Sequence, residues 1–508
     1  MPNTINFAGQ QIVEPGVYGE ILGQVPAPVI TATYANVFLI DTGSQGTGVG
    51  GTGISYGGGS GVAGQLQQNG NSVYKFTNAA DFQAFVRGGL LWDLASYLFT
   101  PSTSGAPGPQ NVYHARAATT TAPQFTFALP TAAGSLVFDA KNEGVGSNGV
   151  LTGGVLTRGY GCKIIAGIIN PSAFIIQFYE GTFRGTGADG NPYAGIAEAS
   201  IVTNNIVSSS PEFTTAAQFI AWATNDSSFN QYFVLDAATV TSTTVINASV
   251  LTTYSGVQIF IGGTTQYSLA VLQTLLTYIS NYDNSAFLCD DYGVTPTIQG
   301  SDILDGCNKG GLSAFNQAIL THIQTQALYK YKTMYIGGGQ NSTQYTTGNN
   351  DGSRDQALYY NNCNTAVVHS GVKVPSTVGG TGVAYKYNSS LYNAAMVCGR
   401  IAGLQPQVPG TYKDIRIIGL QHELSLPQRV DALQHGVLHQ KNVNGLGWVI
   451  NQSVNTLQKN TSIIYNDGTS PEISIVRICF TLLQGLNLNA LGFVGGNINT
   501  VSGSDLQT

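Results

Sequence analysis

Residues 286–370 contain three short apolar segments, Ala286-Phe287-Leu288-Cys289, Thr333-Met334-Tyr335-Ile336 and Thr365-Ala366-Val367-Val368-His369. The sequences between them predict helices over 312–329 and near 353–360. Each apolar segment is too short for a helix and is almost uninterrupted by polar residues, which is typical of strands buried on both faces. Because short strands that alternate with helices pair in parallel, this region predicts a parallel α/β sheet.

The same alternation extends in both directions along the chain. Towards the N-terminus, we expect a strand over 35–40, a helix from Asn78 towards Leu98 and a strand over 111–116. Before the quoted segments, Val257-Gln258-Ile259-Phe260-Ile261 predicts a further strand of the sheet, followed by a helix over 268–280. The α/β domain is therefore expected in two parts, residues 35–116 and residues 251–385.

Residues 117–250, between these two parts, have a different pattern. Short β segments with frequent glycines, such as Gln124–Leu129 and Ala173–Tyr179, predict an inserted β-rich domain. One helix is expected to begin at Ser210-Pro211-Glu212, which supplies a cap, a first-turn proline and a first-turn acid. Phe213, Ala217 and Ile220 would line one face of this helix.

The remaining residues predict a separate α+β domain over 386–496 and two extended arms, residues 1–34 and 497–508. The α+β domain would contain helix 391–403, strand Asp414–Ile418, a helix from Pro427, a hairpin around Asn444-Gly445 and an amphipathic helix opened by Ser470-Pro471-Glu472. Pro15 and Gly16 break any helix near the N-terminus. The fold class is thus α/β plus β, with extended termini.

The 508-residue chain carries unusually little charge, since charged residues make up 9% of it, against roughly 25% in ordinary soluble domains. Its 43% of hydrophobic residues excludes disorder. Residues 185–308 contain ten acids and no Lys or Arg, and residues 309–508 sum to +5. That distribution argues against nucleic-acid binding and is compatible with subunits that dock acidic surfaces on basic ones. A mostly uncharged surface indicates burial in a large assembly, with a hydroxyl- and amide-rich free surface as the alternative.

No apolar run is long enough to span a bilayer, so we expect no membrane insertion. The segment Met1–Phe7 has neither a basic nor an apolar leader region, so we expect no export. The six cysteines are dispersed without a CxxC pair, which predicts buried free thiols.

Motifs that could carry chemistry are incomplete, so we predict no catalytic residue, cofactor or metal. Asp41-Thr42-Gly43 lacks the second copy that aspartic-protease chemistry needs. The glycine pattern Gly46-x-Gly48-x-x-Gly51 is not followed by the helix that would bind a pyrophosphate. His435 and His439 have zinc-ligand spacing, but Gly436 ends the helix between them, so the rings should diverge.

One constellation leaves a hydrolase open as an alternative. Asp290, Asp291, His369 and Ser370 follow predicted parallel strands, and ligands bind at the carboxyl ends of such strands. An acid, a histidine and a serine can form a hydrolytic triad. A GxSxG elbow is absent, which argues against this assignment.

The collinear order of several short motifs resembles contractile-tail sheath proteins of phages and related injection systems. The motifs are Glu14-Pro15-Gly16-Val17-Tyr18-Gly19-Glu20, Pro28, the strand near Phe38, Asp81-Phe82, Val112–Arg116, Phe138–Gly144, Ala394–Leu404, Glu472–Ile478 and Gly492–Gly496. The Gly-rich loop over 43–64 and the scarcity of charge depart from the family pattern.

The resemblance implies a structural subunit and not an enzyme. It implies a subtilisin-like α/β domain without catalytic residues, an inserted outer β-rich domain and a C-terminal domain that faces the tail tube. Subunits of this family stack as hexameric rings around the tube and contract to drive it through a target envelope. Expected partners are other copies, the tail tube protein, and baseplate and tail terminator proteins, in a virion tail assembled in the bacterial cytoplasm. A surface-layer or adhesin-type protein is the other alternative.

Terminal arms of this family add strands to a neighbour's sheet, and extended segments with unpaired backbone groups suit that role. The candidate arm residues are Val13, Gly16, Val17, Tyr18, Ile498 and Val501. The candidate tube-facing residues, Arg477 and Gln484, lie on the last helix.

Overall fold

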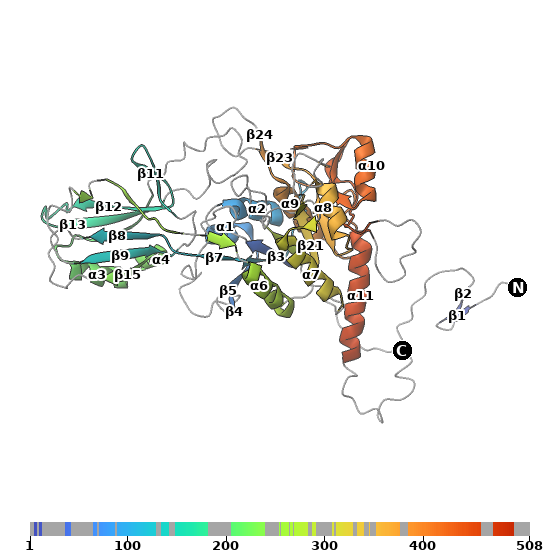
Figure 1. Cartoon of the computed structure of the whole chain (residues 1–508), viewed down its shortest axis with the longest axis horizontal. Coiled ribbons are helices and arrows are strands. Elements are labelled where there is room, and N and C mark those ends of the chain that lie inside the picture. Colours follow the sequence, from blue (N-terminus) through green and yellow to red (C-terminus); the bar gives the residue numbers. More distant parts are fainter. Residues whose placement is uncertain are drawn as a thin grey trace, which may run out of the picture.

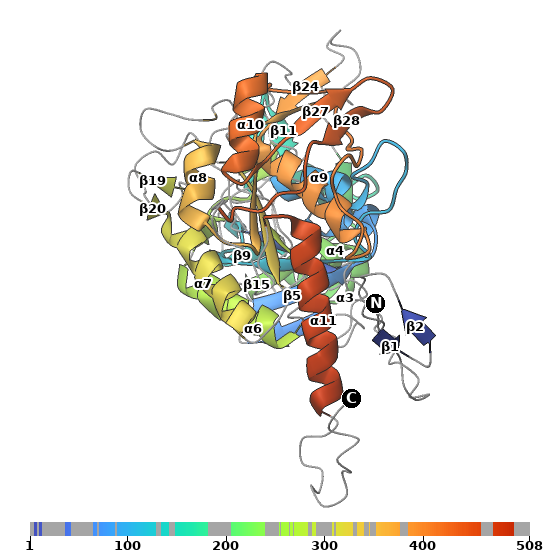
Figure 2. The same ribbon diagram turned by 90° about the vertical axis from the view of Figure 1, so that its right-hand side faces the viewer.

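The computed structural model describes residues 5–7, 10–12, 36–41, 65–68, 71–86, 89–128, 134–141, 148–180, 205–238, 253–254, 256–263, 265–267, 269–282, 287–290, 307–308, 311–328, 333–339, 345, 352–375, 385–458 and 471–491. It has a mixed α/β body and a β-rich lobe that projects from one side (Figure 1). Figure 2 looks onto the body along the direction of this projection.

The body is built on an eight-stranded sheet in the order β26-β22-β21-β18-β3-β6-β5-β4. Its strands are β3 (Asn36–Asp41), β4 (Gln65–Gln68), β5 (Asn71–Phe76), β6 (Asn111–Arg116), β18 (Phe287–Asp290), β21 (Met334–Gly338), β22 (Thr365–Val368) and β26 (Val437–Leu438). All neighbours from β26 to β6 pair in parallel, whereas the β6–β5 and β5–β4 pairs are antiparallel. The predicted parallel α/β sheet is confirmed.

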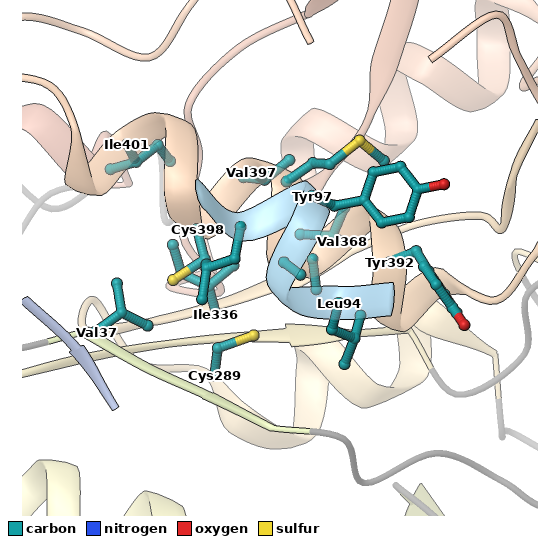
Figure 3. Packing of buried hydrophobic residues seen from close by; sticks show 14 of the residues in the cluster. Val37, Leu94, Tyr97, Cys289, Ile336, Val368, Tyr392, Val397, Cys398 and Ile401 are labelled. Atoms are coloured by element: carbon teal, nitrogen blue, oxygen red, sulfur yellow. The ribbon is translucent and has the colours of Figure 1, made fainter. Parts of the chain in front are cut away.

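Helices cover both faces of this sheet, and alternate strand residues divide between two cores. Val37 and Leu39 face α1 (Ala79–Val86), α2 (Gly89–Phe99) and α9 (Ser390–Ala402). Phe38 and Ile40 face α6 (Leu269–Tyr282), α7 (Ala314–Leu328), α8 (Ser353–Tyr360) and α10 (Leu426–Gln434). Figure 3 shows α2 and α9 packed over strand residues such as Val37 and Ile336. Because the central strands β3, β18 and β22 are covered on both sides, their sequences are mostly apolar.

The lobe has a core of its own, rich in phenylalanine. One sheet has the order β15-β9-β8, with β8 (Gln124–Ala128), β9 (Ser135–Ala140) and β15 (Phe233–Ala238). The other has the order β14-β13-β12-β16, with β12 (Tyr160–Ala166), β13 (Phe174–Glu180), β14 (Asn205–Ser209) and β16 (Gln258–Ile259). Phe138 of the first sheet contacts Phe178 of the second with ring centroids 5.6 Å apart. Helices α3 (Ala216–Asn225) and α4 (Ser227–Tyr232) add Phe219 and Phe229 to this core.

The lobe joins the body through β7 (Ala118–Thr120) and β17 (Thr265–Tyr267), which pair antiparallel with each other. We call these two strands the neck. A hairpin of β10 (Val150–Thr152) and β11 (Val155–Arg158) also belongs to the lobe.

The segment 257–261 was expected in the main sheet, and this prediction is wrong. Its strand β16 pairs with β12 of the lobe, and Ile261 bridges to Gln124. An apolar run predicts a strand but not the sheet that the strand joins, because pairing partners are set by tertiary structure.

The remaining described elements are β1 (Ile5–Phe7), β2 (Gln10–Ile12), β19 (Cys307–Asn308), β20 (Gly311–Leu312), β23 (Val372–Pro375), β24 (Tyr385–Asn388), β25 (Gly419–Leu420), β27 (Gln440–Val443), β28 (Gly447–Ile450) and α11 (Ile473–Leu491). Strands β27 and β28 form the hairpin predicted at Asn444-Gly445. Helix α11 begins directly after Ser470-Pro471-Glu472, as predicted.

Two expectations for residues 386–496 differ from the structure. The strand predicted over 414–418 is reduced to a single bridge between Asp414 and Val449, because its backbone N–H groups bond to separate segments: that of Ile415 to Trp448, that of Arg416 to Pro101 and that of Ile418 to Lys373. In addition, two elements of this region, α9 and β26, are part of the body and do not belong to a separate domain. Helix α9 packs on α2 and β21 in the body core, and β26 is an edge strand of the main sheet.

Candidate functional site

The predicted arm residues Val13, Gly16, Val17, Tyr18, Ile498 and Val501 lie outside the described residues. The arm role therefore stays a prediction. Within the N-terminal 34 residues, the structure describes a hairpin in which β1 pairs with β2, with Ile5 opposite Ile12.

A small sheet of the body ends in a strand that could accept an added strand. Its order is β24-β23-β25, so β24 forms one edge among the described residues. An edge strand has one row of backbone N–H and C=O groups that can pair with another chain.

Helix α11 starts in the body core and projects away from it (Figure 2). Ile473 and Val476 in its first turn are buried. Arg477 is only 4% exposed, donates a 2.7 Å hydrogen bond to the Leu404 carbonyl and stacks over the Phe287 ring at 5.5 Å. The Arg477 guanidinium thus anchors the helix to the body. The structure gives the position of Gln484 on α11 but not the placement of its side chain.

The opposite face of α11 is apolar and exposed. Ile475 and Leu482, two helical turns apart, are 47% and 61% exposed. Arg477 is the single charged residue of the helix.

The constellation suspected as a hydrolytic triad is not assembled in the part of the chain that is described. Asp290 ends β18 and His369 follows β22, and β21 lies between these strands. Burial and the adjacent Asp290 carboxylate raise the pKa of Tyr335 on β21. Asp291 lies outside the described residues. Ser370 donates to the neighbouring Gly371 carbonyl and accepts a hydrogen bond from the His422 N–H.

His369 instead joins a hydrogen-bonded chain that the sequence did not reveal. Ser353, the first residue of α8, lies with its Oγ 2.7 Å from His369 Nδ1. His369 Nε2 lies 3.2 Å from His422 Nδ1. Ser353 and His369 are fully buried, whereas His422 is half-buried. No spacing motif links these residues, since His422 is 53 positions from His369.

The chemistry of this Ser353–His369–His422 chain is unsuited to catalysis. A serine beside a histidine has the form of a nucleophile and its base. Burial, with smaller contributions from His422 and His439, lowers the pKa of His369 to about 3. Such an imidazole is a poor base at neutral pH, and the enclosed Ser353 hydroxyl has no exposed surface. These three hydrogen-bonded residues therefore form a polar connection between α8, β22 and the segment after β25.

Buried amides extend this connection through the core. The Asn393 side chain of α9 donates to the His369 carbonyl at 3.0 Å and to Gln440 Oε1 at 2.8 Å. Gln440 returns a 2.7 Å hydrogen bond to Asn393 Oδ1. A satisfied buried network of this kind fixes the register of the elements that it joins.

The two histidines with zinc-ligand spacing have separate partners. Helix α10 ends before His435, and Gly436 has φ +70°. His435 lies beside Asp431 and Arg354, whereas His439 Nε2 lies 3.0 Å from the Asn451 amide. No group of three potential metal ligands occurs among the described residues.

Asp41 of the Asp-Thr-Gly motif is buried and contacts a histidine. Its Oδ2 lies 3.1 Å from His114 Nε2 on the neighbouring strand β6. This pair lies inside the sheet, and both side chains are about 1% exposed. None of the helices within the described ranges is long and apolar enough to cross a membrane.

Comparison with solved structures places this fold among sheath proteins. The crystal structure of a sheath tail protein from Desulfitobacterium hafniense matches with a TM-score of 0.54, over 94% of this chain and 82% of that one, at 12% identity. The resemblance predicted from sequence is thus confirmed at the level of the fold.

Other solved structures are similar to a lesser degree. A sheath tail protein from Listeria innocua gives a TM-score of 0.46 at 13% identity, over 89% of this chain and 74% of that one. The contracted helical sheath of the anti-feeding prophage gives 0.30 at 12% identity, over 47% and 57%. No model of a protein family and no curated protein matches the chain.

Proposed function

We propose that this chain is the structural subunit of a contractile tail sheath. In this role it polymerises as stacked hexameric rings around a tail tube and contracts to drive the tube through a target cell envelope. The observation that carries the proposal is the match of nearly the whole chain to the fold of a sheath tail protein. The body corresponds to a subtilisin-like domain without the catalytic function, and the particle belongs to a virion or a phage-like device.

A structural role also suits the polar residues of the body. Ser353 and His369 are fully buried, and the His369 imidazole is a poor base at neutral pH. The hydrolase alternative has no accessible nucleophile among the described candidates. A Ser353→Ala variant should therefore lose stability without any loss of a hydrolytic activity.

The terminal arms, which contain Val17 and Ile498, are proposed to add strands to neighbouring copies. Strand β24 is the proposed acceptor edge. Main-chain linkage of this kind can persist while subunits shift between two packings during contraction.

The proposed tube-facing element is α11. Its exposed Ile475 and Leu482 would contact the tube protein, and Arg477 would hold the helix against the body. Gln484 lies further along the projecting part of the same helix.

Electron microscopy of the purified full-length chain tests the proposal. We expect hollow tubes of uniform width, and flat arrays would instead indicate a surface-layer protein. Deletion of residues 1–20 should abolish tube formation. Val17→Pro, which removes a backbone donor, should impair it, whereas Val17→Ala should not. Normal tubes from the deletion variant would contradict the arm role.

A further inference from the structure

The hairpin between β12 and β13 ends in a tip at the far end of the lobe. Tyr160 begins β12 and its carbonyl accepts a hydrogen bond from the Phe260 N–H, next to the Gln124–Ile261 bridge. Gln124 follows the neck by four residues, so β12 runs outward from the neck. We call residues 166–173, at its outer end, the lobe tip.

Two adjacent isoleucines dominate the surface of the lobe tip. Ile168 and Ile169 are 81% and 91% exposed, the highest values among the exposed large apolar residues of the described chain. Their exposed neighbours are Ala166, Asn170, Pro171 and Ser172, which carry no charge. An apolar pair held in water at the end of a projection is unfavourable unless another surface covers it.

A carboxylate fixes the backbone that presents these isoleucines. Glu212 Oε1 accepts hydrogen bonds from the N–H groups of Ile168 at 2.5 Å and Ile169 at 2.6 Å. Glu212 Oε2 accepts from the N–H of Asn170 at 2.9 Å. These backbone hydrogen bonds, that of Ile169 foremost, lower the pKa of Glu212. The Glu212 carboxylate is therefore directed at the backbone, and the Ile168 and Ile169 side chains are left exposed.

Gly167 completes the arrangement. Its N–H bonds to the Ala173 carbonyl at 2.7 Å, and a Cβ at this position would lie 2.3 Å from the Asn170 carbonyl oxygen. Only glycine fits where the turn closes on itself. The conformation of the lobe tip is therefore fixed before any partner arrives, which lowers the entropic cost of binding.

We propose that the lobe tip docks on the lobe of a second copy of this chain. The inference rests on the proposed assembly. Two isoleucines cover far less than the roughly 800 Å² per partner that a stable pair buries, so free copies would pair through this contact only transiently and at high protein concentration. It can act where other contacts already keep copies at high local concentration.

The lobe of a neighbouring copy offers exposed apolar residues on edge strands of its two sheets. Ile206 on β14 and Val234 on β15 are 47% and 40% exposed. A lipid surface fits less well, because interfacial segments use basic and aromatic side chains, and the exposed lobe-tip residues are of neither kind.

The test uses full-length protein with a photoreactive phenylalanine analogue in place of Ile169. Isotopically heavy and light copies are mixed, irradiated both as polymer and as concentrated soluble protein, and digested for mass spectrometry. We expect heavy–light crosslinks from position 169 to residues 205–238. Crosslinks confined to one copy, or to the body, would overturn the inference. The soluble sample decides the point even if no tubes form, which would count against the proposed function alone.

Substitution gives a second, independent measurement. The double variant Ile168→Ser/Ile169→Ser should raise the protein concentration needed for polymer formation by about tenfold. Leu446→Ser is the matched control, because Leu446 is also exposed at a hairpin turn, in the body. Equal effects of the two variants would contradict docking by the lobe tip. Docking on a second copy would also be contradicted if the parent protein, but not the double serine variant, sedimented with neutral phosphatidylcholine vesicles.

Discussion

His369 and His439 are buried as neutral imidazoles, and this makes folding sensitive to acid. Burial lowers the pKa of His369 to about 3 and that of His439 to about 4, from an ordinary 6.5. Below pH 6.5 these imidazoles bind protons in the unfolded protein but stay neutral in the folded protein. The free energy of unfolding therefore falls as pH falls. The loss should approach about 1.4 kcal/mol per pH unit for each histidine.

Denaturant unfolding at pH 7, 6 and 5 measures this loss. The variant His439→Asn should show a shallower decline than the parent protein, because one of the histidines with a lowered pKa no longer titrates. A free energy of unfolding that is constant between pH 7 and pH 5 would show that these imidazoles are not buried as described.

Asp414 ties an N-terminal loop to the C-terminal region. Its Oδ2 accepts hydrogen bonds from Ser102 Oγ at 2.5 Å and the Ser104 N–H at 2.9 Å, and Oδ1 pairs with Arg400 at 3.3 Å. Burial alone would raise its pKa, but these hydrogen bonds, that of Ser102 foremost, hold the pKa well below its ordinary value. Asp414→Asn should reduce stability by about 1–3 kcal/mol.

Thermal unfolding of two variants tests the role of Asp414. Asp226→Asn removes the same charge at the N-cap of α4, where asparagine caps as well as aspartate, and should be nearly neutral. Equal melting temperatures for Asp414→Asn and Asp226→Asn would show that the Asp414 hydrogen bonds to the 102–104 loop do not stabilise the protein.

At the scale of elements, helix α9 depends on a close approach to α2. A Cβ on Gly399 would lie 2.1 Å from the Leu98 carbonyl oxygen, which is backbone and cannot move aside. Gly399→Ala should therefore destabilise the body by more than about 2 kcal/mol despite the higher helix propensity of alanine. Gly256→Ala, with open space around the added methyl group, is the control and should leave chemical unfolding unchanged.

Elements were predicted well where local sequence decides them. Helix α8 was expected at 353–360 and is found there, and the start of α11 follows its proline and acid. The helix expected to begin at Ser210-Pro211-Glu212 begins instead at Ala216, after the Thr215 cap. Glu212 binds the lobe tip, more than forty residues earlier in the sequence, and no local pattern reveals such a contact.

The candidate sites were predicted less well for the same reason. His369 was identified by its position after a strand, but its partners Ser353 and His422 come from α8 and from the segment after β25. Their meeting depends on strand order and on helix placement. Sequence periodicity predicts which residues are buried, but not which buried polar groups meet.

At the scale of the whole molecule, the lobe should be separable and the C-terminal region should not. The neck strands pair Thr120 with Thr265, so residues 121–264 can be replaced by an Asn-Gly turn. We expect the shortened chain to keep cooperative unfolding, because the body core contains no lobe residue. Circular dichroism and a melting curve measure this.

A deletion of residues 411–508 is the counterpart. It removes β26 from the main sheet, and Ile415, Ile450 and Ile473 from the body core. This variant should lose cooperative unfolding altogether. Cooperative unfolding of the 411–508 deletion variant would contradict the shared core of the body. So would loss of cooperative unfolding when only residues 121–264 are replaced.

The turn between β10 and β11 has a practical consequence. Gly153 and Gly154 both have positive φ, and a side chain at either would meet nothing within 4 Å. The two strands that flank the turn pair with each other, so the two ends of an inserted peptide would lie close together. A foreign peptide can be spliced between the two glycines with little disturbance to the lobe, and a polymer of such subunits would display that peptide once per copy along its length.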